Sequence, residues 1–115
     1  MRVGAGLIEL HVHGSRSLKQ KRGVVKAIVQ RLRNRFNISV AEVGGQDTWQ
    51  RAVLGLSLVG CDAQGVRRGL AAAIEFVDSL HLAEIRASDV EILDIAQEDW
   101  DEERADQDPL PWEKE

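Results

Sequence analysis

Residues 16–35, RSLKQKRGVVKAIVQRLRNR, combine dense positive charge with helical periodicity. The segment contains no Asp or Glu, and it contains eight cations: Arg16, Lys19, Lys21, Arg22, Lys26, Arg31, Arg33 and Arg35. Lysine and arginine bind phosphate through charge-assisted hydrogen bonds. A row of cations along a helix is typical of surfaces that bind a nucleic-acid backbone.

Some of these cations lie at the beginning of the predicted helix, where they do not favour folding. Each of Lys19, Lys21 and Arg22 faces the positive end of the helix dipole, which costs about 0.3–1 kcal/mol. An anion bound there would reverse this effect, because free backbone N–H groups, dipole and cations would all point at it. We therefore predict an anion or nucleic-acid site whose candidate residues are Ser15, Arg16, Ser17, Lys19, Arg22, Lys26 and Arg33.

On a helical wheel, four of the cations form one stripe beside the apolar face, the basic stripe: Lys19, Arg22, Lys26 and Arg33. The stripe is about 20 Å long, which suits a nucleic-acid backbone better than one small anion. Two alternatives remain. The cations could form a solvated face that pairs with Glu75 and Asp78 or with the acidic C-terminal segment, or they could bind a protein partner with an acidic surface.

The charge of the 115-residue chain is unevenly distributed. Its formal net charge is -4, but residues 98–115 alone carry nine acids against Arg104 and Lys114, a net of -7, so residues 1–97 carry +3. Dense like charge with Pro109 and Pro111 is typical of disorder. We predict one folded domain over 1–97 and a disordered acidic tail over 98–115. The tail also holds Trp100 and Trp112, which are candidate partner anchors.

The sequence indicates a soluble cytoplasmic protein. The N-terminus lacks a signal peptide, since Glu9 and His11 interrupt its apolar residues. The longest apolar stretch, 10 residues, is too short to span a bilayer. The single cysteine, Cys61, cannot form an internal disulfide and is predicted to be a small buried side chain.

The periodicity predicts strands over 3–12, 38–43, 49–60 and 87–96, and helices over 17–37 and 63–80. Ser17 and Gln20 fit a capping box, and Asp62 fits the N-cap of the second helix. The order β-α-β-β-α-β predicts a ferredoxin-like α+β fold, with two helices on one face of a four-stranded antiparallel sheet. Right-handed crossovers place the first and third strands at its centre.

The helix-free face of this sheet argues against one mode of RNA binding. Its outward positions on the central strands hold no Phe or Tyr on which bases could stack: Glu9, His11, Arg51, Val53, Gly55 and Ser57. Nucleic-acid contact is therefore expected through the helices. The face is moderately apolar through Val43, Val53, Leu93 and Ile95, which suits self-association, so a homodimeric interaction module is the alternative function.

Other polar groups give weaker signals. Glu9, His11 and His13 share a strand face, but a further strong ligand is missing, so no metal site is predicted. The segment GGQDTWQR, 44–51, is either a polar ligand site or a hairpin loop in which Trp49 covers the core edge. The chain lacks a Walker loop, a nucleophile elbow and an acid–base carboxylate pair. We expect no enzyme activity, no catalytic residue and no cofactor.

Residues 2–95 resemble the YlxP-like family, small bacterial proteins classed as a domain of unknown function. The motifs that carry the resemblance are IELHVHG in the first strand, then SLKQKR, LRNRFNISVAEV and QDTWQRA in order. The resemblance implies a ferredoxin-like fold and no known activity. Members tend to be encoded beside transcription and translation factors, which favours RNA or the ribosome as partner. The acidic tail lies outside the resemblance.

Overall fold

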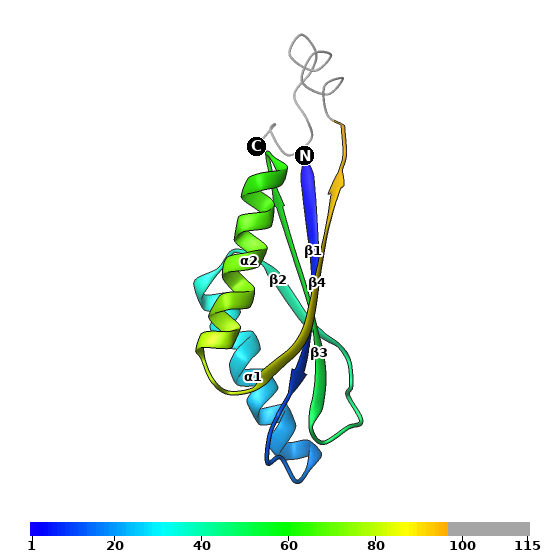
Figure 1. Ribbon diagram of the computed structural model, residues 1–115, viewed down its shortest axis with the longest axis vertical. Helices are drawn as coiled ribbons and strands as arrows, with labels where there is room; N and C mark the ends of the chain where they lie inside the picture. The colour runs from blue at the N-terminus through cyan, green and yellow to red at the C-terminus, as the bar shows by residue number, and fades with distance from the viewer. Residues whose placement is uncertain (97–115) are drawn as a thin grey trace, which may run out of the picture.

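The computed structural model describes residues 1–96, which form six elements (Figure 1). In chain order these are β1 (Arg2–His11), α1 (Leu18–Arg35), β2 (Ser39–Gly44), β3 (Arg51–Gly60), α2 (Ala63–Ser79) and β4 (Glu84–Asp94). The predicted order β-α-β-β-α-β and the ferredoxin-like α+β class are confirmed. The predicted acidic tail, 98–115, lies outside the described residues.

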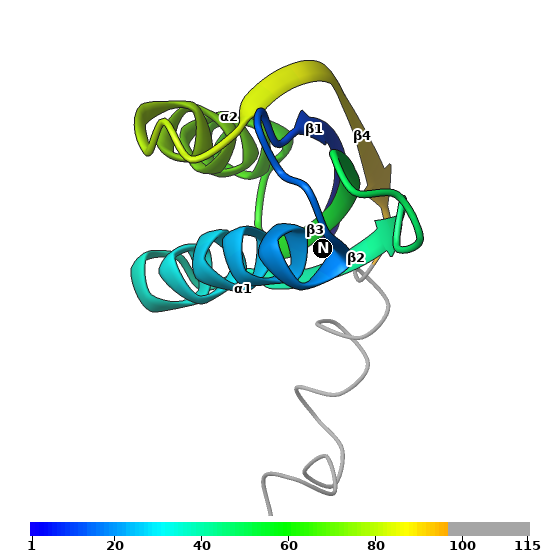
Figure 2. The same ribbon diagram turned by 90° about the horizontal axis from the view of Figure 1, so that it is seen from below.

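The four strands form one sheet in the order β2-β3-β1-β4, and all neighbouring strands are antiparallel. The central positions of β1 and β3 are as predicted. Both helices cover the same face of the sheet, side by side, and leave the other face open (Figure 2). The strand order makes β2 and β4 the edge strands, and α1 lies on the β2 side of the sheet.

Local capping chemistry fixes where both helices begin. Ser17 Oγ accepts a hydrogen bond from the backbone N–H of Gln20 at 3.1 Å, and Asp62 Oδ1 accepts one from Gly65 at 2.6 Å. The Gln20 side chain accepts from the N–H of Arg16 at 2.7 Å, so the capping box closes one residue before the N-cap. Helix α1 ends at Arg35, with Phe36 as its C-cap.

The core lies between the sheet and the helices, and it follows the predicted alternation. From the strands it takes Ile8, Leu10, Val40, Ala52, Leu54 and Leu56, and from the helices Val25, Ile28, Leu32, Val66, Leu70, Ala73 and Val77. Both periodicities, two in the strands and 3.6 in the helices, therefore direct apolar side chains to one interior layer.

Two predictions about the edges of elements were wrong. β4 begins at Glu84, three residues before the predicted start. Charged residues such as Glu84 and Arg86 suit an edge strand but lower its apolar signal. Cys61 is exposed and not buried, because it lies in the turn after β3, where the strand alternation has ended.

Candidate nucleic-acid interface

The basic stripe runs along the outer side of α1, next to the edge strand β2. Arg33 fixes this orientation, because its Nη2 donates a hydrogen bond to the backbone oxygen of Val40 at 2.7 Å. The opposite flank of α1 faces α2, where the Arg35 guanidinium lies 5.2 Å from the centre of the Phe76 ring. The stripe is therefore accessible along one side of the molecule and is not covered by the second helix.

Three cations of the stripe, Lys19, Arg22 and Lys26, are exposed and form no ion pair within residues 1–96. The cations on the sheet differ, since each has an acidic partner: Arg2 with Asp94 at 2.5 Å, Arg51 with Glu9 at 3.0 Å, and Arg86 with Glu84 at 2.9 Å. Glu75 and Asp78 pair with no α1 cation in this part of the chain. The acidic tail, the other predicted partner, lies outside the described residues.

The two serines of the predicted site use their hydroxyls within the chain. Ser15 is buried, and its Oγ donates to the backbone oxygen of Ser17 at 3.1 Å. Ser17 Oγ caps α1 through Gln20. Arg16 is exposed beside them, and its N–H bonds to the Gln20 side chain. Arg16 therefore extends the exposed cations of α1 by one, whereas the serines shape the loop.

Lys21 lies outside the basic stripe, and the structure gives it a distinct role. Its side chain is fully buried. Nζ donates to the backbone oxygens of Gly45 at 2.6 Å, Gln46 at 3.3 Å and Arg51 at 3.3 Å, and it pairs with the Glu42 carboxylate at 3.3 Å. Lys21 therefore ties the first turns of α1 to the β2–β3 loop, residues 45–50.

The β2–β3 loop lies at the same end of the molecule as the beginning of α1 (Figure 1). Gly45 has a positive φ of 75°, which favours glycine at this turn. Thr48 Oγ1 bonds to the backbone oxygens of Gly45 and Arg51, both at 2.9 Å. Trp49 is 57% exposed and does not cover the core edge. The loop is thus a hydrogen-bonded hairpin connection that presents an aromatic side chain.

His11 and His13, for which the sequence predicted no metal site, lie beside the start of β4. The rings of His11 and His13 are 4.2 Å apart in an edge-to-face arrangement, and His13 Nε2 is bonded to a Glu84 carboxylate oxygen. This bond holds the pKa of the exposed Glu84 carboxyl below its usual range. Within residues 1–96, no three His, Cys, Asp or Glu side chains gather as a metal-ligating group.

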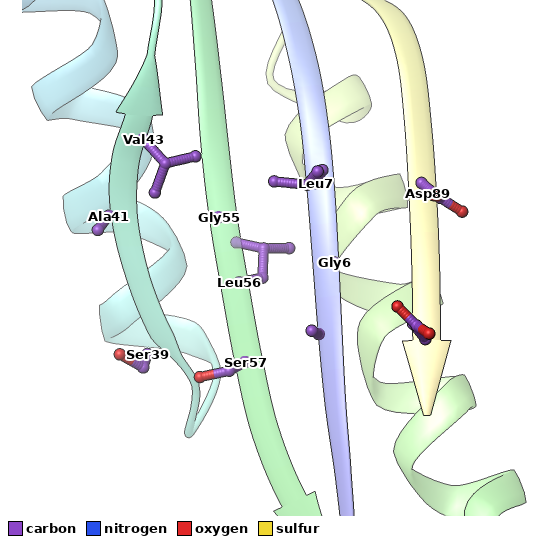
Figure 3. Close-up of a pocket in the computed structure, with 11 residues that line it drawn as sticks. Gly6, Leu7, Ser39, Ala41, Val43, Gly55, Leu56, Ser57 and Asp89 are labelled. Carbon is purple, nitrogen blue, oxygen red and sulfur yellow. The ribbon is translucent and has the colours of Figure 1, made fainter. Parts of the chain in front are cut away.

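The open sheet face carries a shallow groove of 350 Å³ (Figure 3). Small residues form its floor, with Gly55 at the centre, while Leu7 and Val43 project over it from the strands on either side. Asp89 and Glu91 of β4 line one wall. Within the described chain, none of the groove residues is aromatic, as the sequence predicted for this face.

Comparison with known proteins then places the chain in a family. A family model described as a protein of unknown function, DUF503, matches residues 3–92. The chain belongs to the DUF503 family. It is 38% identical over 77 residues to the uncharacterized protein YlxP of Bacillus subtilis (strain 168), covering 67% of this chain and 84% of that protein. The predicted resemblance is thereby confirmed, and it brings no activity with it.

A solved structure of distant sequence shares the fold, and a further solved structure is similar to part of it. SnoaB, a cofactor-independent oxygenase from Streptomyces nogalater, matches 84% of this chain and 96% of its own with a TM-score of 0.50 and 14% identity. The de novo designed protein Foldit4 matches 84% of this chain and all of its own with a TM-score of 0.47 and 11% identity. Such similarity concerns the fold alone. Within the described residues, neither helix has the length and apolar character needed to cross a membrane.

Proposed function

We propose that this DUF503 protein is a non-enzymatic, cytoplasmic binding protein that holds RNA, free or in the ribosome, against the exposed cations of α1. One observation carries the proposal: Lys19, Arg22 and Lys26 lie on one accessible side without acidic partners, whereas the sheet cations are paired. When unpaired cations in a row bind a phosphate backbone, they displace the counterions condensed on the nucleic acid. The release of these counterions makes binding favourable and dependent on salt.

The spacing of these cations suits a chain of phosphates. From Lys19 to Lys26, seven residues of helix span about 10 Å, and Arg16 extends the row at its beginning. Arg33 extends it at the other end, with one guanidinium nitrogen already bonded to Val40. An arginine guanidinium has five N–H donors, so the other donors of Arg33 remain available to phosphate oxygens.

A triple substitution tests the stripe. Lys19→Gln, Arg22→Gln and Lys26→Gln together should lower the slope of log affinity against log salt by about 2 for single-stranded RNA, because each lost phosphate contact removes about 0.7. The measurement is fluorescence anisotropy with a labelled RNA of about eight nucleotides at a series of salt concentrations. Sedimentation with purified ribosomal subunits extends the test to the ribosome.

The matched control removes three paired cations from the sheet: Arg2→Gln, Arg51→Gln and Arg86→Gln. It changes the net charge by the same amount at a different place. The proposal requires the stripe variant to bind RNA more weakly than this control. Equal slopes for the two variants would show that overall charge, and not the α1 surface, governs binding.

A second function, association of two copies through the open sheet face, is favoured by a separate observation. Large apolar side chains are exposed there, among them Leu7 at 48%, Val43 at 53%, Leu93 at 56% and Val59 at 65%. Exposed apolar area of this kind on one face is typical of an interaction surface. Two such faces would bury one another, and the groove over Gly55 would receive side chains of the second copy.

Leu7→Lys tests this second function. Leu7 lies opposite Gly55 on β3 and Asp89 on β4, so a lysine there can pair with Asp89 while the monomer keeps its fold. We expect light scattering to give a dimer for the natural protein and a monomer for Leu7→Lys. The control Ala72→Lys adds the same charge on exposed α2 and should remain dimeric. A natural protein that is monomeric at high concentration would exclude the interface.

A further inference from the structure

The β2–β3 loop, residues 45–50, is held in place from several sides. Lys21 donates to three backbone carbonyl groups in and next to the loop. The Thr48 hydroxyl bonds to the carbonyl groups at both ends of the loop, those of Gly45 and Arg51. Gln50 joins the loop to the segment before α1. Its side-chain Nε2 donates to the backbone oxygen of Ser15 at 3.2 Å, and its backbone oxygen accepts from the N–H of Val12 at 2.7 Å. The loop therefore has a fixed position relative to the beginning of α1.

Trp49 lies between these anchors, Thr48 and Gln50, yet 57% of it is exposed. A tryptophan is large and apolar, and its exposure in the monomer forgoes the hydrophobic gain that burial would give. Because neighbouring residues fix the loop, the loop itself would lose little conformational entropy when a partner covers the ring. The ring is thus a preorganised contact surface.

The surroundings of the loop indicate what kind of partner would cover Trp49. Arg16, Lys19 and Arg22 belong to the segment that Lys21 and Gln50 fasten to the loop, and all three are exposed without an ion pair in the described chain. The loop itself contributes one acid, Asp47. An exposed aromatic ring at the same end of the molecule as a row of cations suits single-stranded nucleic acid, whose bases stack on aromatic rings while its phosphates bind cations.

A protein partner is less well matched to these features. An apolar protein surface would bury Trp49 but would leave the three cations at this end of the molecule without counter-charges. RNA can bind both the Trp49 ring and the cations with one repeating unit, because every nucleotide carries a flat base and a phosphate. The open sheet face cannot supply the stacking, since no aromatic side chain lines its groove within the described residues.

We propose that Trp49 is a base-stacking platform for single-stranded RNA whose phosphates lie on Arg16, Lys19 and Arg22. This inference rests on the proposed function, because the same RNA must engage the α1 cations. Beyond the proposed function, we infer that the bases of the RNA contribute to the binding free energy, in addition to its phosphates. Stacking is tolerant of sequence, so a preference for unpaired over double-stranded RNA is expected.

The test uses two probes with the same phosphates: a mixed-sequence RNA of about eight nucleotides and an abasic oligomer of equal length. The protein carries Trp100→Phe and Trp112→Phe, so that Trp49 is its one tryptophan. RNA should quench the Trp49 fluorescence, whereas the abasic oligomer should bind more weakly and quench little. Trp49→Ala, measured by anisotropy, should weaken RNA binding by about 5- to 150-fold and leave abasic binding and the salt slope unchanged. Trp49→Phe should restore most of the affinity.

The outcomes separate this inference from the proposed function. Equal binding of RNA and abasic oligomer by the natural protein would overturn the stacking role and leave the α1 backbone site intact. A Trp49→Ala variant that loses affinity for both oligomers equally would also overturn it, since that result indicates a role in loop structure. Binding of neither oligomer would refute the proposed function, and the stacking role with it.

Discussion

Lys21→Met is expected to lower the free energy of unfolding by about 3 kcal/mol. Methionine nearly matches the lysine side chain in length and fills the same buried space, but it has no ammonium group. The change would leave the Glu42 carboxylate, whose side chain is 21% exposed, without its partner. It would also remove a donor from Gly45, Gln46 and Arg51. Thr48 still bonds two of these carbonyls, which keeps the loss at the lower end of the range for a broken buried pair.

The loss should be local as well as global. Thr48 N–H donates to Gly45 O at 3.1 Å, and Val12 N–H donates to Gln50 O at 2.7 Å. Hydrogen exchange at both amides should speed up in Lys21→Met by more than the change in global stability explains. Urea unfolding followed by circular dichroism gives the global value. Lys19→Met, two residues earlier and exposed, is the control and should change stability by no more than about 0.5 kcal/mol. Equal stability of the two variants would contradict the role assigned to Lys21.

The position of Lys21 shows what the sequence could and could not predict. The spacing contains a signal that the sequence analysis did not use, since Lys21, Val25, Ile28 and Leu32 follow one another at intervals of four, three and four, as on one helix face. A buried lysine is rare, so the residue was counted with the solvent-exposed cations. Its partners are mostly backbone carbonyls of a loop, and residue types do not reveal which carbonyls a loop will turn inward.

Features with local causes were predicted well. Ser17 and Asp62 cap the two helices as expected, because a cap depends on residues only three apart. The strand order followed from right-handed crossovers, which hold for nearly all such connections. The exposure of Trp49 depends instead on the path of a loop between two strands, which is a tertiary property. The bond from Arg33 to Val40 is of the same kind, since it requires the register of α1 against β2.

Gly4→Ala is expected to destabilise the protein by about 2 kcal/mol, because the added methyl has no space. A Cβ at position 4 would lie 2.4 Å from Val66 Cγ1 and 2.7 Å from Leu70 Cδ1, both on the buried face of α2. Leu70 has rotatable bonds through which it can yield. Val66 does not, because a valine in a helix has one preferred rotamer.

Gly23→Ala is the matched control for this substitution. Gly23 lies inside α1, and nothing lies within 4 Å of the position that its Cβ would take. Alanine there should raise the free energy of unfolding by about 0.5–1 kcal/mol, because glycine loses more backbone entropy in a helix. The same chemical change thus has opposite signs at two sites. Urea unfolding of both variants checks the pair, and destabilisation by Gly23→Ala would show that the surface of α1 is less open than described.

A double-mutant cycle then identifies Val66 as the side chain that resists the methyl at position 4. Val66→Ala alone should cost about 2 kcal/mol, since it removes two buried methyl groups and leaves a cavity. In Gly4→Ala/Val66→Ala the new methyl enters that cavity, so the two losses should fall short of their sum by about 1–2 kcal/mol. Strictly additive losses would mean that Gly4 is required for strand conformation and not for the close approach of α2.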